Sequence, residues 1–331
     1  MFTAGREGCS RQAEPPGEER RIPKNMKDRI VCRVITGPTA SGKTALSLRM
    51  AEKHGWEICC MDSMQIYRGM DIGTAKPTEA ERQRVRHHLL DICDPGESFS
   101  VTLYREAAES LIRRKWEEER RELLFVGGTG LYLQAMMHPM GMGTVPADEE
   151  MRRELHQLAD QPGGREKLHV LLEKLDPETA EKLPLNDIRR IVRAIEVTRI
   201  SGIPFSRQPQ REMTSEFTWK VASTSLPREI LYERINRRVE NMMEQGLEGE
   251  VRSLLNRGVS PEAQSMQALG YKELVWYLEG IWPLDRAVEE IRKRTRHYAK
   301  RQETFLKRES QIQYINMLEK DAFEQAESIL T

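Results

Sequence analysis

Long hydrophobic runs, paired cysteine motifs and an excess of charge of either sign are all missing from this sequence of 331 residues. No apolar stretch approaches the roughly 20 residues that a membrane-spanning helix requires, and residues 1–27 contain no apolar core of the kind that secretory signals have. The five cysteines form no C-x-x-C motif, which argues against a zinc site and against a disulfide framework. We therefore expect a cytoplasmic protein with no membrane segment, whose cysteines serve as small apolar residues.

The balance of charge excludes a uniformly basic surface but leaves local patches open. The chain has 52 Lys and Arg against 52 Asp and Glu, so its formal net charge is zero. A general nucleic-acid binder usually carries a strong positive excess. Hydrophobic residues make up 38% of the chain, which is enough for a sizeable core and rules out disorder over the whole length. Any basic binding surface is therefore confined to part of the protein.

Alternating hydrophobic patterns predict an α/β fold. Short apolar runs predict strands at 30–36, 57–61, 122–126 and 218–226, and amphipathic stretches predict helices before Gly55 and at 100–119, 228–245, 247–257 and 287–306. Strands that alternate with helices are typical of a parallel, doubly wound sheet. We predict a discontinuous core domain at 28–145 and 214–315, a parallel sheet flanked by helices. An all-helical insertion occupies 146–213, and 1–27 form a solvated tail in which Met26 is an alternative start.

A glycine-rich motif between the first strand and its helix indicates phosphate binding, and makes the predicted core a P-loop-type domain. The motif G-x-x-x-x-G-K-[ST] is matched in full by Gly37, Pro38, Thr39, Ala40, Ser41, Gly42, Lys43 and Thr44. Such a segment turns backbone N–H groups inward at a helix N-terminus, where Lys43 adds a positive charge and the Thr44 hydroxyl can ligate Mg²⁺. We expect a diphosphate or nucleotide to bind here, with a plain glycine turn as the structural alternative.

The acidic residue of the site follows the second strand. P-loop nucleotide hydrolases end a neighbouring strand with an Asp, but the strand at 122–126 leads into Gly127, Gly128 and Thr129. Asp62 instead follows the strand at 57–61, at the edge where open α/β sheets bind ligands. A turn or helix-capping Asp is the structural alternative.

Several blocks of sequence resemble the signature segments of tRNA dimethylallyltransferases, in the order that this family has them. They are GPTASGKT at 37–44, DSMQIYRGMDIGTAKP at 62–77, VGGTGLY at 126–132, NDIRRIVRAIEV at 186–197, LYERINRRV at 231–239 and QALGYKEL at 267–274. The family transfers a dimethylallyl group from dimethylallyl diphosphate to N6 of the adenosine 3′ of the anticodon, in tRNAs that read codons beginning with U. No cysteine follows Cys93, so the C-terminal zinc finger of many eukaryotic relatives is missing and we expect a bacterial-type enzyme.

The resemblance implies catalytic roles for Asp62, Thr129 and Arg234. An adenine amine is a weak nucleophile, so a base must take its proton as the C–N bond forms, and Asp62 is the candidate. Thr129 is expected beside the diphosphate or the adenine, with a turn-capping Thr as the alternative. An allylic diphosphate leaves readily once its charge is neutralised, which calls for a polyanion clamp. The P-loop, Mg²⁺ held through Thr44, and Arg234 with Arg238 four residues later would form that clamp, unless these arginines only make surface salt bridges.

The same resemblance implies contacts with the anticodon stem-loop of tRNA. Ser63 and Gln65 match positions that contact an extruded base, and Asp62 and Met64 beside them are also expected to contact the tRNA. Arg189, Arg190 and Arg193 lie outside the apolar face of their helix. A further basic stretch, residues 291–308, has eight Lys or Arg and one Glu. Its structural alternative is a solvated amphipathic face. We also weigh Lys76 and Arg68 as residues along the RNA path, and we expect a monomer that needs no protein partner.

Two other classes of function stay open at this point. A small-molecule or nucleoside kinase would bind ATP at the P-loop and use Asp62 to activate a hydroxyl, and a nonenzymatic RNA-binding adaptor would hold a nucleotide as a structural ligand. The pair His87-His88 is typical of metal chemistry, but no acid or third ligand lies at a supporting spacing, so packing or local hydrogen bonding is favoured.

Overall fold

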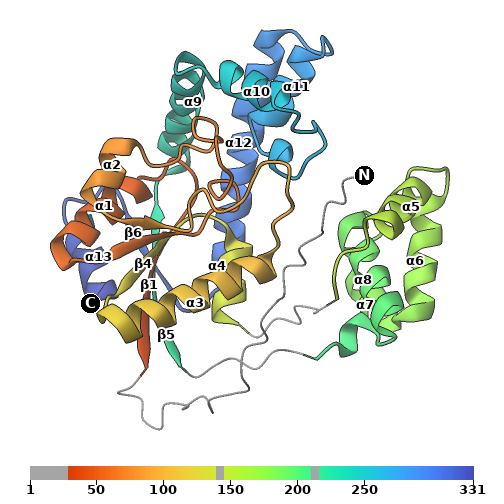
Figure 1. Ribbon diagram of the computed structural model, residues 1–331, viewed down its shortest axis with the longest axis horizontal. Helices are drawn as coiled ribbons and strands as arrows, with labels where there is room; N and C mark the ends of the chain where they lie inside the picture. The colour runs from red at the N-terminus through yellow and green to blue at the C-terminus, as the bar shows by residue number, and fades with distance from the viewer. Residues whose placement is uncertain (1–28, 139–144, 210–215) are drawn as a thin grey trace, which may run out of the picture.

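A computed structural model describes residues 29–138, 145–209 and 216–331 of the chain (Figure 1). The predicted tail at 1–27 and the predicted boundary after residue 213 lie outside the described residues. Within these ranges no helix combines the length and the apolar composition needed to cross a membrane.

The core is one parallel sheet with the strand order β3-β2-β4-β1-β5-β6. The strands are β1 (Ile30–Thr36), β2 (Glu57–Cys60), β3 (His87–His88), β4 (Leu123–Val126), β5 (Phe217–Ser225) and β6 (Ile312–Asn316). Val34 of β1 lies opposite Phe125 of β4 on one side and Val221 of β5 on the other. The α/β fold class and the four predicted strands are confirmed. Because all pairs are parallel, the carboxyl ends of the strands meet at one edge of the sheet.

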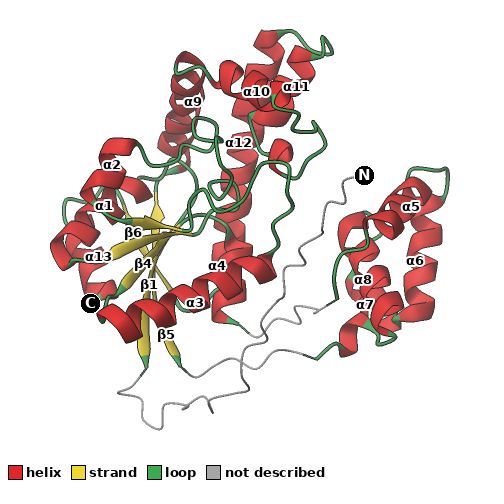
Figure 2. Cartoon of the chain, in the orientation of Figure 1, coloured by secondary structure: helices red, strands yellow, loops and turns green. Residues whose placement is uncertain are grey.

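Helices cover both faces of the sheet, as Figure 2 shows. One face packs against α3 (Val101–Glu119) and α4 (Gly130–Met137) through the cluster that includes Tyr104 and Leu133. The other face packs against α1 (Lys43–His54) and α13 (Ala322–Leu330), with α2 (Glu79–Arg84) nearby. The predicted end of α1 is confirmed, since Gly55 adopts φ 67° and its N–H caps the Ala51 carbonyl.

The core domain extends beyond its predicted end at residue 315, so that boundary is wrong. Strand β6 ends at Asn316, and α13 buries Phe323, Ala326 and Leu330 against the sheet. These apolar residues recur at helical spacing, but the strand before them is short, and its exposed Tyr314 hides the alternation of a half-buried strand.

A second group of helices stands over the carboxyl edge of the sheet. It consists of α9 (Arg228–Glu244), α10 (Leu247–Asn256), α11 (Tyr271–Leu278) and α12 (Leu284–Leu306). Their shared core also takes in Ile66, Tyr67 and Met70 from the loop that follows β2. The loop after Asp62 is therefore packed from above by these helices, while α12 runs down to the sheet (Figure 1).

The inserted segment is all helical in its described part, as predicted. It contains α5 (Glu149–Ala159), α6 (Gly164–Leu175), α7 (Pro177–Lys182) and α8 (Ile188–Ser201), followed by a 3₁₀ turn at Phe205–Arg207. Asp148, Asp176 and Asp187 accept hydrogen bonds from backbone N–H groups at the starts of α5, α7 and α8. A core of its own, which includes Leu168, Leu172 and Ile195, holds these helices together.

Candidate active site

Three of the predicted site segments meet at the carboxyl edge of the sheet. The P-loop follows β1, Asp62 follows β2, and the turn Gly127–Thr129 follows β4. Backbone hydrogen bonds join the three strand ends: the Met61 N–H donates to the Val126 carbonyl at 2.8 Å and the Gly127 N–H to the Ile35 carbonyl at 3.2 Å. A side chain at Gly127 would meet the Met61 carbonyl oxygen at 2.0 Å. The turn therefore needs glycine for the strand ends to come this close.

The P-loop has the backbone that its glycines allow. Gly37 and Gly42 have φ values of 137° and 98°, in the region that side chains disfavour, and a Cβ on Gly37 would lie 2.3 Å from the Thr224 hydroxyl oxygen. The Ser41 hydroxyl donates to the Pro38 carbonyl at 2.7 Å and is hydrogen-bonded to Thr224 at 2.6 Å. These contacts hold the P-loop against β5. A plain glycine turn would not need such contacts.

The Lys43 side chain is hydrogen-bonded to the backbone of the P-loop itself. Its Nζ donates to the Gly37 and Pro38 carbonyl oxygens at 2.9 and 2.7 Å. Burial and the nearby Arg238 guanidinium lower the pKa of Lys43 to about 7, and Asp62 acts in the opposite direction. A polyanion at this place would favour the charged form of Lys43, so binding and protonation are coupled.

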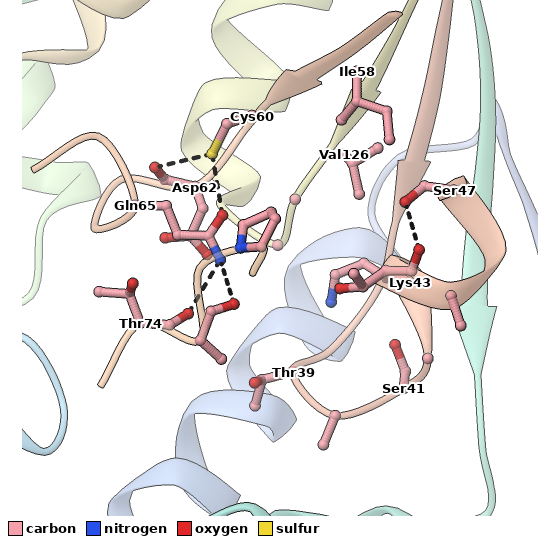
Figure 3. Close-up of a pocket in the computed structure, with 18 of the residues that line it drawn as sticks. Thr39, Ser41, Lys43, Ser47, Ile58, Cys60, Asp62, Gln65, Thr74 and Val126 are labelled. Atoms are coloured by element: carbon pink, nitrogen blue, oxygen red, sulfur yellow. Dashed lines mark hydrogen bonds between the residues drawn. The ribbon is translucent and has the colours of Figure 1, made fainter. Parts of the chain in front are cut away.

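Two adjoining cavities open at this edge. The larger, of about 450 Å³, is lined by the P-loop and by Asp62, Gln65, Arg234 and Arg238, several of which are labelled in Figure 3. The second, of about 300 Å³, is lined by Ser63, Met64, Val239, Met242 and other residues of the helices above. A set of residues lines both cavities: Thr39, Asp62, Thr74, Arg238 and Tyr298. The site is therefore a cavity lined by the P-loop beside a more apolar one, and Asp62 lines both.

The Asp62 carboxyl group is oriented by its own turn. Its Oδ1 accepts a hydrogen bond from the Met64 N–H at 2.9 Å. This bond is the one expected of a turn Asp, so the structural alternative describes part of what the residue does. The side chain nevertheless lines both cavities, which a turn role alone does not require.

Thr129 stands at the N-cap position of α4, but its side chain does not cap the helix. Its side chain makes no capping hydrogen bond. Its Oγ1 instead accepts from the Ser63 N–H at 3.0 Å and lies 3.4 Å from the Ser63 hydroxyl. Thr129 therefore ties the turn after β4 to the residue that follows Asp62, close to the cavities rather than in their lining.

The two predicted arginines differ in position. Arg238 is half-buried, lines both cavities and donates to the Thr74 carbonyl at 3.4 Å. Burial lowers the pKa of Arg238 and the Asp62 carboxylate opposes that shift. Arg234 is exposed and lines only the larger cavity, and Arg237 faces outward. Within the described residues neither Arg234 nor Arg238 forms a salt bridge, which argues against the surface-pair alternative.

Among the predicted RNA contacts, some side chains are already engaged within the protein. Gln65 Nε2 donates to the Thr74 and Ala75 carbonyls, both at 3.1 Å. Arg193 pairs with the buried Glu196 at 2.6 Å and donates to the Val145 carbonyl, whereas Arg189 and Arg190 are exposed on α8. These contacts give Arg193 a structural role within the insertion. Of the three predicted arginines, Arg189 and Arg190 are the ones that face solvent.

Two further residues, Lys76 and Arg68, were expected along the RNA path, and the structure shows the position of each. The expectation that Lys76 lies along the RNA path is wrong, because its ammonium group is buried between Asp71 and Asp91 at 2.6 Å from each. Arg68 is exposed and pairs with Asp94. The histidine pair makes local hydrogen bonds, one of its two predicted roles: His88 is hydrogen-bonded to Glu57 and His87 to the Val85 carbonyl, both at 2.7 Å.

The basic helix α12 divides into two parts. Arg292, Lys293, Arg294 and Arg296 pair with glutamates of α9, α11 and α12, as a solvated amphipathic face would. The later basic residues, Lys300, Arg301, Lys307 and Arg308, are exposed. The second half of α12 and the two residues that follow it are therefore the part that can offer positive charge to a phosphate backbone.

Three residues of the site were not found from the sequence. Tyr298 lines both cavities and Gln302 lines the larger one. Glu250 of α10 accepts from the N–H groups of the 71–73 segment, at 2.8, 2.8 and 3.2 Å, and from the Tyr271 hydroxyl at 2.5 Å. The one available signal was Gln302 itself, a polar residue four positions after Tyr298 on the apolar side of α12.

Comparisons with known proteins agree on one family. Residues 65–309 match the family model described as IPP transferase. The chain is 44% identical over 300 residues to a tRNA dimethylallyltransferase of Geobacillus thermodenitrificans, covering 90% of this chain and 93% of that one. It is also similar to the crystal structure of the tRNA isopentenylpyrophosphate transferase of Bacillus halodurans (TM-score 0.66, 39% identity, 91% and 95% coverage). A eukaryotic dimethylallyltransferase acting on tRNA matches with TM-score 0.72 and 25% identity, covering 91% of this chain and 78% of that one.

Proposed function

Since this chain belongs to the IPP transferase family, we propose that it is a tRNA dimethylallyltransferase, which transfers a dimethylallyl group from dimethylallyl diphosphate to N6 of the adenosine 3′ of the anticodon. The acceptors are tRNAs that read codons beginning with U, and diphosphate is released. One observation carries the proposal: Asp62 and Arg238 line both the P-loop cavity and the adjoining apolar cavity. A donor in one and a base in the other would meet at these two side chains.

The donor diphosphate is assigned to the larger cavity. The backbone N–H groups of residues 42–44, at the start of α1, and the Lys43 ammonium group supply positive charge from one side, and Arg234 and Arg238 supply it from α9. This arrangement stabilises the leaving group as the bond from C1 of the donor to oxygen breaks. The same groups hold the diphosphate before and during the reaction, so they contribute to both binding and rate.

A divalent cation fits the donor set of this cavity. The Thr44 hydroxyl, the Asp62 carboxylate and the Glu81 carboxylate line it, and all three offer hard oxygen atoms. Within the described ranges there is no cluster of His, Cys, Asp or Glu that would enclose a metal without help. That suits Mg²⁺, which keeps water ligands and shares phosphate oxygens. Thr44 is the proposed protein ligand, and bound Mg²⁺ would neutralise charge on the diphosphate.

The adenine is assigned to the second cavity. Met64, Val239 and Met242 give it apolar walls against which a base can pack, and Ser63 and Gln267 add polar groups. A stacked adenine does not expose N6 to a carbon electrophile, so the base must leave the anticodon loop to enter. Asp62 then takes a proton from N6 as the bond from N6 to C1 forms and the bond from C1 to the diphosphate oxygen breaks.

The remainder of the tRNA would lie on two exposed basic surfaces. Arg189 and Arg190 project from the helical insertion, and the last basic residues of α12 project from the core domain. Such contacts go mainly to phosphates and position the RNA, while the unpaired loop carries the sequence that is read. We propose a monomer, and with tRNA as the acceptor we place it in the cytoplasm.

The proposal is tested with purified protein, Mg²⁺, radiolabelled dimethylallyl diphosphate and unmodified tRNA that carries adenosine 3′ of the anticodon. Label is expected in acid-precipitable RNA, and it is expected to disappear when that adenosine is replaced by guanosine. ATP consumption in place of prenyl transfer would contradict the proposal and favour a kinase.

A further inference from the structure

One buried side chain joins the P-loop to the turn that follows β4. Gln302 lies on α12, and its Oε1 accepts a hydrogen bond from the Thr39 N–H at 2.9 Å. Its Nε2 donates to the Gly128 carbonyl at 2.8 Å. The side chain is only 6% exposed. Both ends of one carboxamide are therefore used, each by the backbone of a different segment of the site.

A side chain at position 128 would displace the Gln302 carboxamide from this contact. A Cβ on Gly128 would lie 2.1 Å from Gln302 Nε2 and 3.1 Å from the Gly37 carbonyl oxygen. The P-loop, the turn and the Gln302 side chain thus meet where Gly128 contributes backbone alone. Few side chains offer an acceptor and a donor with this reach, and loss of either leaves a buried backbone group without its partner.

The two segments that Gln302 joins have different tasks in the proposed reaction. The P-loop holds the diphosphate. The turn carries Thr129, whose Oγ1 accepts a hydrogen bond from the N–H of Ser63, the residue that follows Asp62. The position of the diphosphate relative to the base therefore depends on how these segments are held against each other.

We propose that Gln302 is a positioning residue that fixes the P-loop relative to the turn at Gly127–Thr129, and so places the donor diphosphate relative to Asp62. The inference rests on the proposed function of the two cavities. It assigns no contact between Gln302 and the reacting atoms. Because α12 also carries Tyr298 at both cavities and the exposed Lys300 and Arg301, the helix that holds the P-loop is the helix that faces the RNA.

The test uses full-length Gln302→Met and Gln302→Glu, with Gln313→Met on an exposed position of β6 as the matched control. Inorganic diphosphate with Mg²⁺ is titrated by calorimetry, and steady-state transfer is measured with each substrate varied. Gln302→Met removes both hydrogen bonds at nearly constant volume. We expect about tenfold weaker diphosphate binding and a higher KM for the donor, with the KM for tRNA unchanged, because two ordinary hydrogen bonds account for a change of this size.

The Gln302→Glu variant introduces a titratable group at the same place. A protonated carboxyl group has one acceptor and one donor, as the amide has, whereas a carboxylate has acceptors only. Relative to wild type at the same pH, diphosphate binding by Gln302→Glu is expected to be weak at pH 8.5 and to recover toward pH 5.5. Because residue 302 lines the diphosphate cavity, a carboxylate there also repels the anion, so the positioning role is judged from Gln302→Met.

Either of two results overturns the inference. One is diphosphate affinity of Gln302→Met within twofold of wild type, and the other is an increase in its KM for tRNA equal to the increase in its KM for the donor. Failure of the wild-type protein to transfer the prenyl group, with diphosphate binding still dependent on Gln302, would refute the proposed function and leave the positioning role standing.

Discussion

Asp62 and Arg238 meet at the junction of two cavities, and each lines both. Burial lowers the pKa of Arg238, and the Asp62 carboxylate opposes that shift by stabilising the charged guanidinium. The base of the proposed reaction and a cation of the diphosphate clamp are thus neighbours, and neither is tied up in a salt bridge among the described residues. This pairing brings the group that accepts a proton next to the group that stabilises the leaving anion.

Replacing Asp62 separates chemistry from RNA binding. Asp62→Asn keeps the shape of the side chain but removes the base, so turnover is expected to fall by about 10² to 10⁴. Affinity for tRNA is expected to change by less than about threefold, because RNA is held mainly through its phosphates. Single-turnover transfer and a filter-binding titration measure the two quantities. Asp94→Asn is the control, since Asp94 is exposed and pairs only with Arg68 among the residues described. Unchanged turnover would remove Asp62 from the mechanism.

The adjacent arginines of α9 form a natural matched pair. Arg238 reaches both cavities, while Arg237 is exposed and lines neither. Arg238→Ala is expected to lower kcat/KM for the donor by about 100-fold, as loss of a transition-state charge contact does, and Arg237→Ala to leave it within about twofold. Donor-dependent kinetics at saturating tRNA measure the difference. Equal effects of the two variants would mean that general charge, rather than the position of Arg238, supports catalysis.

The protonation state of Lys43 makes diphosphate binding depend on pH. Burial lowers its pKa to about 7 in the free protein. Below that pH Lys43 is charged and ready for an anion. Above it the neutral amine must take up a proton when the anion binds, so this group weakens binding as the pH rises. Calorimetry at pH 8 in buffers of different ionisation enthalpy is expected to show proton uptake.

Lys43→Arg supplies the comparison for that measurement, because an arginine stays charged across the range. Proton uptake at pH 8 is expected to be smaller in this variant than in wild type. Equal uptake in both proteins would assign the titration to the diphosphate itself.

Glu250 holds the loop that follows Asp62. Its carboxylate accepts from the N–H groups of Asp71, Ile72 and Gly73 and from the Tyr271 hydroxyl. Glu250→Ala leaves these donors unpaired and is expected to lower the free energy of unfolding by about 2 to 4 kcal/mol. Urea denaturation measures it, with Glu248→Ala as the control, whose carboxylate pairs with Arg252 one turn away. A change in the Glu250 variant no larger than in the control would contradict the anchoring role.

The local parts of the site were predictable because each is written in one short segment. The P-loop, Asp62 and the turn at Thr129 each follow a strand whose apolar run is plain in the sequence, and parallel strands bring their carboxyl ends together. Arg234 and Arg238 were selected together by their spacing of four residues on one helix. These inferences needed no knowledge of contacts between distant segments.

What the sequence did not reveal depends on such distant contacts. Gln302 meets Thr39 across 263 positions of the chain, and Glu250 meets the loop after Asp62 across nearly 180. Lys76 and Arg193 were likewise predicted to contact RNA, but in the fold they form buried or internal ion pairs. A charged residue in a basic stretch has the same pattern whether it faces solvent or a buried carboxylate, so only the fold separates the two.

The most direct test of the account is to identify the nucleoside that the enzyme makes. A tRNA with adenosine 3′ of the anticodon is incubated with dimethylallyl diphosphate and Mg²⁺, digested to nucleosides and analysed by chromatography and mass spectrometry. The account predicts N6-dimethylallyladenosine from that one position with wild-type protein, and a large loss of it with Asp62→Asn. Unmodified adenosine throughout, or a prenyl group on another atom or nucleotide, would contradict it.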